Sequence, residues 1–352
     1  MKTKRVKRGR VLVGLSGGVD SLVTAHLLKE KGWEVSGLFL NLTGRGEREA
    51  RLAARQLQIN LIVKNYQKEF TETIIRYFQE AYRRGLTPNP CALCNPLVKF
   101  RYLLTTAREE GFDYSASGHY VRLVQQNKQL TLQRGVDQTK DQSYFLFGLS
   151  AAMLSKLIFP LGNYWKKDVI NLAQDKGYQI KSPESQDVCF LAENSLADFF
   201  SANFSEQKKD KIKPGLIIDR QGTRLGHHRG LMFYTIGQRH GLGLGGDGPY
   251  YVVDKDVQKN TLVVSNLPTD LKKERIIFRA NNWLLTPRSD RQYLLQIRYQ
   301  MKPIPITLQR LVEPEGYWEA RALAGKFQAV SPGQMAVVYQ DDLVVGGGEI
   351  VR

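Results

Sequence analysis

The sequence has few cysteines, few acidic residues and no long hydrophobic run. Its 352 residues include three Cys, and 34 Asp and Glu stand against 51 Lys and Arg. No stretch approaches the roughly 18 uninterrupted apolar residues of a membrane helix. The basic segment 2–10 is followed by an apolar run that glycines soon interrupt, which argues against a signal peptide. We therefore expect a cytoplasmic protein with no membrane segment.

The shortage of acidic residues leaves a formal net charge of +17 and a sequence pI near 9.7. Such an excess favours a polyanionic partner through phosphate neutralisation, and nucleic acid is the first expectation. Two basic runs, at 2–10 and 208–213, contribute to it. Either run can also be a solvated tail or linker, so the global excess carries the argument.

A Walker phosphate-binding motif is also absent, because the one Gly-Lys pair, at 325–326, precedes Phe327. A different phosphate-binding pattern follows the apolar run at 11–13. A strand that leads through small residues into a helix presents backbone N–H groups to a polyphosphate. The turn resembles the SGGxDS loop (PP-loop) of the N-type ATP pyrophosphatases, which implies that ATP binds here and that Asp20 holds Mg²⁺ against the phosphates. The turn consists of Gly14, Leu15, Ser16, Gly17, Gly18, Val19, Asp20 and Ser21.

The first half of the chain alternates strand and helix patterns. Strands are expected at 11–15, 34–40, 60–64 and 113–117, and helices at 21–31, 46–57, 68–84, 95–110, 140–148 and 165–176, with a hairpin at 120–134. This order predicts an α/β fold with a doubly wound parallel sheet, in which ligands bind beyond the carboxyl ends of the strands. After a lysine-rich segment the pattern changes to short strands separated by Gly and Pro, which is typical of small barrels. We expect a PP-loop domain at 1–205 and two small β-rich domains at 206–272 and 273–352, the last a β-barrel.

Cys91, Cys94 and Cys189 are the candidate thiols, and a Cys-x-x-Cys pair indicates redox chemistry or metal binding. Two nearby prolines predict a loop before a helix that starts near residue 96, so Cys94 is expected at a helix N-terminus, where the dipole stabilises a thiolate. A zinc site lacks a fourth ligand, because the histidines show no metal-ligand spacing. A [4Fe-4S] cluster on the three thiols and a persulfide relay between two of them both remain open.

From residue 11 onward the chain resembles the bacterial tRNA-specific 2-thiouridylases. Besides the PP-loop, the resemblance is carried by the segments 87–95, 99–100, 117–120, 134–135, 140–145, 160–162, 185–190, 234–243, 297–299, 332–334 and 346–348. It implies ATP-dependent thiolation of C2 of the wobble uridine in tRNA, with ATP, Mg²⁺ and a sulfur-donor protein. Adenylation suits this chemistry, because the C2 oxygen of uracil is a poor leaving group until it departs as AMP.

The resemblance also implies roles for individual residues. Cys189 carries the sulfur as a persulfide, and Cys94 completes the transfer and is left in a Cys94–Cys189 disulfide. Leu40 and Gly118 fall at positions that contact the adenine nucleotide. Asn89, Pro90 and Cys91 fall beside the target base, and Cys91 is there a base contact, a spare thiol or a third cluster ligand. The further tRNA-contacting positions are His119, Lys140, Asp141, Gln142, Arg298, Tyr299 and Gln334.

The chain departs from the family after Leu40, where segment 41–46 is short and passes directly into the helix at 47–57. We expect a trimmed, more basic rim that alters docking of tRNA or the sulfur donor and leaves ATP binding intact. Two rival functions remain: an amidotransferase-linked nucleotide synthetase, which does not need paired loop cysteines, and a tRNA-binding relative without catalysis. The complete set of Ser16, Asp20, Ser21 and three thiols argues against loss of catalysis.

Overall fold

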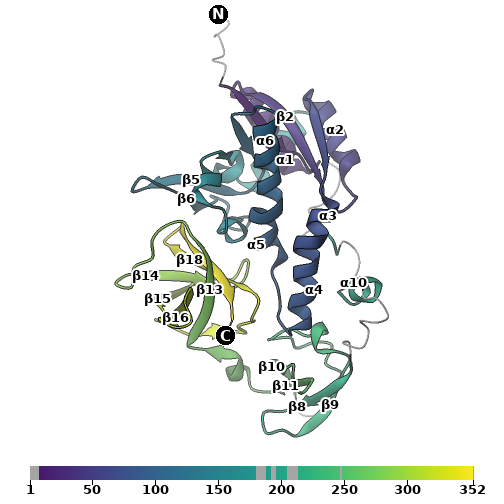
Figure 1. The fold of residues 1–352 in the computed structure, drawn as a ribbon, viewed down its shortest axis with the longest axis vertical. Helices are drawn as coiled ribbons and strands as arrows, with labels where there is room; N and C mark the ends of the chain where they lie inside the picture. Colours follow the sequence, from purple (N-terminus) through teal and green to yellow (C-terminus); the bar gives the residue numbers. More distant parts are fainter. Residues whose placement is uncertain (1–7, 180–187, 192–195, 204–212, 246–247, 352) are drawn as a thin grey trace, which may run out of the picture.

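The computed structural model describes residues 8–179, 188–191, 196–203, 213–245 and 248–351. Figure 1 shows three bodies along the chain: an α/β layer, a small β unit near α4, and a barrel at the C-terminus. Most of both basic runs, and residues 185–187 of the third cysteine segment, lie outside the described residues. In the described part of the chain no helix is both long and apolar enough to cross a membrane.

The first body is built on a parallel sheet of order β3-β2-β1-β4-β7. β1 (Arg10–Gly14) is central, β2 (Glu34–Asn41) and β4 (Tyr114–Ala116) flank it, and β3 (Leu61–Asn65) and β7 (Leu157–Ile158) form the edges. All four pairings are parallel. The strand order reverses direction at β1, so the crevice beyond the carboxyl ends of β1 and β4 is the expected ligand position.

Helices cover both faces of this sheet. Val11 and Val13 of β1 pack in one core with α1 (Val19–Glu30), α2 (Glu47–Leu57) and α9 (Lys166–Asp175). Leu12 packs in the other core with α6 (Phe100–Glu109), because successive side chains of a strand point to opposite faces. The predicted doubly wound α/β fold is confirmed.

Two long helical segments extend from the sheet. One joins α3 (Gln67–Phe70) through a π-helical turn to α4 (Arg76–Arg83). The other runs without a break from α5 (Pro90–Cys94) through the π-helical turn Asn95–Lys99 into α6. The helix predicted to start at 95 therefore starts at 90, because a proline suits the first helical position and the Asn89 side chain accepts the Ala92 N–H at 3.2 Å.

Two β-rich bodies follow. A four-stranded sheet of order β10-β11-β8-β9 contains β8 (Gly215–Ile218), β9 (Arg224–His228), β10 (Tyr251–Asp256) and β11 (Thr261–Ser265). Six antiparallel strands then close into a barrel through the β13–β19 pairing, which confirms the predicted C-terminal barrel. The barrel strands are β13 (Arg275–Trp283), β14 (Gln292–Gln296), β15 (Ile304–Arg310), β16 (Tyr317–Ala322), β18 (Met335–Gln340) and β19 (Leu343–Ile350). Three further α-helices are described, α7 (Ser143–Leu146), α8 (Ala151–Leu154) and α10 (Leu196–Asn203). Two short strands, β12 (Lys272–Lys273) and β17 (Phe327–Gln328), pair with each other.

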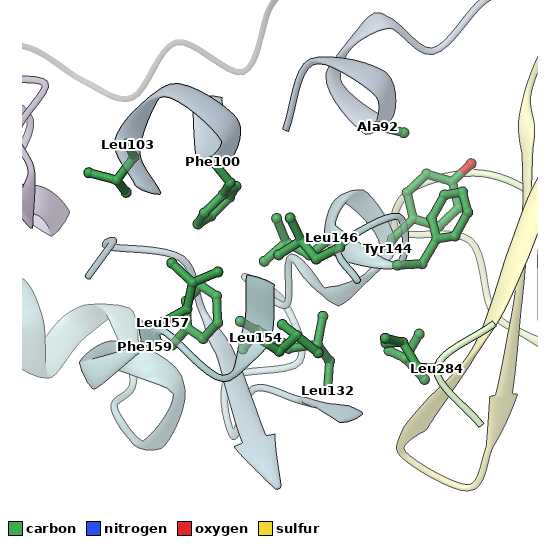
Figure 2. Packing of buried hydrophobic residues seen from close by; sticks show 14 of the residues in the cluster. Ala92, Phe100, Leu103, Leu132, Tyr144, Leu146, Leu154, Leu157, Phe159 and Leu284 are labelled. Atoms are coloured by element: carbon green, nitrogen blue, oxygen red, sulfur yellow. The ribbon is translucent and has the colours of Figure 1, made fainter. Parts of the chain in front are cut away.

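The first body and the barrel share a sheet and a core. The hairpin of β5 (Val121–Gln126) and β6 (Gln129–Arg134) lies beside β19, and the Thr131 hydroxyl donates to the Val344 carbonyl at 2.6 Å. Figure 2 shows Phe100 of α6, Tyr144 of α7 and Leu284 from the barrel in one apolar cluster. This shared core fixes the position of the barrel relative to the parallel sheet.

Candidate nucleotide and thiol site

The loop after β1 is organised by its own serines. The Ser21 hydroxyl donates to the Gly18 carbonyl at 2.9 Å and accepts the Ser16 N–H at 3.2 Å. The Ser16 hydroxyl lies 3.3 Å from that of Ser21 and is exposed. Both hydroxyls therefore shape the loop, since that of Ser16 also accepts the Gly18 N–H at 3.4 Å beside the first turn of α1.

Two glycines are needed here because of close packing. Gly17 has φ +87°, and a Cβ built there lies 2.5 Å from the Glu49 backbone carbon of α2. A Cβ on Gly118 lies 2.8 Å from the Asp20 backbone carbon and 3.0 Å from the Ser21 nitrogen. Gly118, which follows β4, thus lets the chain touch the N-terminus of α1 at the predicted switch point.

A cavity of about 280 Å³ opens at this point. Its walls come from the loop after β1, the end of β2, the start of α6 and the segment after β4, so it lies where the sheet topology predicts a ligand. The lining residues include predicted nucleotide positions and some tRNA positions: Gly14, Leu15, Ser16, Asp20, Ser21, Leu40, Gly118, His119 and Gln142. Gly17, Gly18 and Val19 belong to the loop without lining the cavity.

Asp20 is held by two residues that the sequence analysis did not assign. Lys166, the first residue of α9, donates to both carboxylate oxygens at 2.8 Å, and the Tyr120 hydroxyl donates to Oδ1 at 2.7 Å. Asp20 is the one carboxylate on the described cavity wall, which fits a Mg²⁺ carried mainly by nucleotide phosphates. In the sequence, the position of Lys166 shortly after the Pro-Leu-Gly segment at 160–162 could have identified it as a site residue.

The predicted dipole activation of Cys94 is wrong. Cys94 is the last residue of α5, inside a helix that continues to Glu109, whereas Cys91 is the cysteine in the first turn. The Cys94 side chain is buried, and burial raises its pKa to about 12. Burial likewise raises the pKa of the Cys91 thiol. The groups that make a thiolate at Cys94 must therefore come from elsewhere than the helix N-terminus.

Cys189 is exposed and lines a second cavity of about 370 Å³. Leu42 lines both cavities, and it packs with Cys94 in a cluster that also contacts Phe190. Cys94 and Cys189 lie close enough for their charges to interact with each other and with that of Lys99. The thiols are therefore adjacent to the nucleotide cavity.

The structure gives the cluster alternative no support. Within the described residues, no three or more His, Cys, Asp or Glu side chains form a group that could hold a metal ion. Cys91, Cys94 and Cys189, all of them described, do not form such a group.

His119 and Lys99 complete the cavity wall near the thiols. The His119 ring Nδ1 lies 2.6 Å from the Ser117 hydroxyl, and burial, assisted by the Lys99 charge, lowers its pKa to about 3. His119 is therefore neutral at physiological pH. Gln142 accepts the Tyr120 N–H at 3.1 Å and lines the same cavity.

Several predicted tRNA positions join the domains. Gln334, in the turn before β18, donates to the Thr87 carbonyl at 3.0 Å, next to the cysteine segment. Arg298 donates to the carbonyls of Ile236 and Ala329 at 3.2 and 2.7 Å. These side chains hold the β-rich bodies against each other and against the segment that leads into α5, at whose N-terminus Asn89, Pro90 and Cys91 lie.

The loop at 140–142 is equally ordered. The Asp141 carboxylate is buried and accepts from Arg134 at 3.0 Å, the Gly135 N–H at 3.0 Å and the Ser143 hydroxyl at 2.7 Å. The Lys140 N–H donates to the Asp137 carbonyl at 3.1 Å, and the Tyr299 ring lies 4.5 Å from that of Phe145. Asp141 thus shapes the loop through its side chain, and the RNA contacts of these residues stay predictions.

Comparisons with known proteins match nearly the whole length of the chain. Residues 9–193 match the family described as tRNA methyl transferase HUP domain, residues 204–266 its PRC-barrel domain, and residues 273–350 an aminomethyltransferase beta-barrel domain. The chain is 41% identical over 360 residues to the tRNA-specific 2-thiouridylase MnmA of Chloroflexus aurantiacus, covering 97% of this chain and 98% of that one.

Two further relatives agree. The tRNA-specific 2-thiouridylase MnmA 2 of Thermoanaerobacter sp. is 39% identical over 97% of this chain and 98% of its own. The MnmA 3 protein of Bacteroides fragilis is 39% identical over 97% of this chain and 94% of its own. With a PP-loop on a doubly wound sheet, thiols beside its cavity and identity over nearly the full length, the chain belongs to the tRNA-specific 2-thiouridylase family.

Proposed function

We propose that this protein is a tRNA-uridine 2-sulfurtransferase, which converts ATP to AMP and diphosphate while it replaces the C2 oxygen of the wobble uridine with sulfur. One observation carries the proposal: the PP-loop and the cysteine-bearing helix contribute to one cavity, through Ser16 and Asp20 on one side and Lys99 on the other. A nucleotide synthetase does not need that second wall.

In the first half-reaction, the uracil O2 attacks the α-phosphorus of ATP, and diphosphate leaves. The PP-loop N–H groups and the N-terminus of α1 suit the phosphates. Asp20 would hold Mg²⁺, which neutralises phosphate charge when bound, and Lys166 and Tyr120 position its carboxylate. Leu40 and Gly118 lie on the same wall for the adenine nucleotide.

In the second half-reaction, the terminal sulfur of a Cys189 persulfide attacks C2 as its anion, and AMP leaves with the former C2 oxygen. The Cys94 thiolate then attacks the Cys189 sulfur. A Cys94–Cys189 bond forms, the bond from Cys189 to the transferred sulfur breaks, and its electron pair stays on that sulfur as the thiocarbonyl. The transferred sulfur is reduced as the two cysteines are oxidised, and an external dithiol must reduce their disulfide before the next turnover.

The partners follow from the same chemistry. We assign tRNA binding to the positively charged surface and to the predicted contacts at Asn89, Pro90, Cys91, His119 and the residues that stabilise them. The cavity around the exposed Cys189, bordered by Thr43 and Arg45 of the short segment after Leu40, suits access by a cytoplasmic sulfur-donor protein. This segment is where donor specificity should differ from relatives with a longer loop.

The test uses purified full-length protein with unmodified tRNA, ATP, Mg²⁺ and either sulfide or a cysteine desulfurase. We expect 2-thiouridine and AMP to form in equal amounts, measured by nucleoside mass spectrometry and nucleotide chromatography. Asp20→Ala should abolish both products, and the Cys91→Ser variant distinguishes a base contact from a required thiol. Methylated uridine without AMP, or tRNA binding with neither product, would refute the proposal.

A further inference from the structure

Lys99 is a cation on the wall of the nucleotide cavity that has thiols as its electrostatic partners. It ends the π-helical turn Asn95–Lys99, is half-buried, and lines the same cavity as the PP-loop. Among the described residues, the ionisable groups that act on its charge are Cys94, Cys189 and Cys91, and no carboxylate is among them. A partly buried ammonium without a carboxylate partner is costly unless an anion completes the site.

The π-helical turn Asn95–Lys99 directly follows Cys94 in one continuous helix. Lys99 lies one turn after Cys94, and its backbone N–H and its ammonium both favour the Cys94 thiolate, which opposes the effect of burial on the Cys94 pKa. A π-helical turn inside an α-helix is often found at functional sites. Lys99 therefore supplies the stabilisation that the helix N-terminus does not supply to Cys94.

The neighbouring wall leaves Lys99 free to act on sulfur. His119, which faces it, is neutral, so it neither repels the ammonium nor competes for an anion. Asp20, the other charged residue on the cavity wall, is paired with Lys166. Of the two charged lining residues, Lys99 is the one on the thiol side.

We propose that Lys99 is the cation that keeps the reacting sulfur in its anionic form, first on the Cys189 persulfide and then at Cys94. The inference rests on the proposed sulfur transfer for its role in turnover, but its effect on the thiols holds without tRNA. No bond to Lys99 forms; each thiol proton leaves to solvent, and the ammonium stabilises the charge left behind. Lys99 is thus a positioning and electrostatic residue of the sulfur half-reaction.

The test compares Lys99→Met and Lys99→Arg with the wild type, and Lys68→Met serves as a control that removes an exposed lysine elsewhere. Alkylation rates of each cysteine are measured by peptide mass spectrometry in tRNA-free enzyme between pH 6 and 10. An opposite charge nearby shifts a pKa by about 1–3 units, so Lys99→Met should slow Cys94 alkylation at pH 8 by about tenfold or more. Lys99→Arg and Lys68→Met should keep rates near the wild type.

A second readout separates sulfur chemistry from nucleotide chemistry. Lys99→Met should retain tRNA-dependent exchange of diphosphate into ATP while single-turnover thiolation falls by about tenfold or more. Unchanged alkylation together with a raised KM for ATP would overturn the proposal and assign Lys99 to the phosphates. Lys99→Gln repeats both measurements if the methionine variant does not fold. If the proposed function is wrong, the wild type will form no 2-thiouridine. The alkylation rates would still test the effect of Lys99 on the thiols, because they are measured without tRNA.

Discussion

The ion pair between Asp20 and Lys166 should be a strong link between the PP-loop and α9. The perturbations are Lys166→Met and Asp20→Asn, each alone and both together. Lys166 reaches both carboxylate oxygens at 2.8 Å, with side-chain exposures of 11% for the lysine and 25% for the aspartate. Removing either partner takes the ion pair away from a charge that stays partly buried.

The magnitude follows from this burial. Two unit charges about 4 Å apart attract by about 4 kcal/mol at an effective dielectric of about 20, and breaking a buried pair costs about 3–5 kcal/mol. A quarter of Asp20 is in solvent, which screens part of this. We therefore expect a coupling energy of about 1–3 kcal/mol between the two side chains.

Urea unfolding of the wild type, both single variants and the double variant measures this coupling. Lys167→Met is the matched control, because Lys167 is the next residue of α9 and is exposed. It should change stability by less than about 0.5 kcal/mol. A coupling energy below about 0.5 kcal/mol for the Asp20 and Lys166 pair would refute the reasoning, since the contact would then contribute no more than a surface ion pair.

Three other predictions concern the same site. Cys189→Ser and Cys94→Ser should each abolish 2-thiouridine while AMP still forms with tRNA; full thiolation by either variant with a desulfurase donor contradicts the relay. Burial and Lys99 lower the pKa of His119 to about 3 from an ordinary 6.5, so the unfolded chain binds a proton that the folded one does not, and stability should fall as pH drops from 6.5 towards 3. His119→Asn should flatten that dependence in urea titrations, and equal slopes would exclude the assignment. Gly118→Ala places a methyl group 2.8 Å from the Asp20 backbone and should cost about 1–3 kcal/mol with weaker ATP binding, whereas an unchanged melting temperature would contradict the packing.

The α/β fold was predictable because its signals are local. The apolar run at β1, the glycine turn and the helix that follows are contiguous, and strands β1, β2 and β3 lie within one residue of their predicted positions. β7 was missed because two residues, Leu157–Ile158, carry too little periodicity to indicate a strand. The helix start at Pro90 was missed because two prolines were read as a loop, although the second occupies the first helical position.

The sequence predicted many of the residues that line the site, but not the ionic partners of Asp20 or the direction of the Cys94 pKa shift. The PP-loop was predicted from its motif, and Leu40 and Gly118 were implied by the family resemblance. Leu40, Gly118 and five PP-loop residues line one cavity: Gly14, Leu15, Ser16, Asp20 and Ser21. The partners of Asp20 depend on contacts across 100 or more residues, such as Tyr120 to Asp20. The surroundings of Cys94 combine Leu42, Phe70 and Phe190 from separate segments, which no local pattern encodes. Burial of Cys94 reversed the expected direction of its pKa for the same reason.

The hairpin β5–β6 has a consequence for how the chain can be divided. It belongs by covalent connection to the parallel-sheet body and by pairing to β19 of the barrel. A truncation after residue 272 would leave one edge of this hairpin without its neighbour and expose the ring of Tyr144, which donates to the Met335 carbonyl at 2.9 Å. An isolated ATP-binding fragment would therefore expose an unpaired strand edge, and we expect such fragments to aggregate. The truncation would have this effect although it leaves the PP-loop itself unchanged.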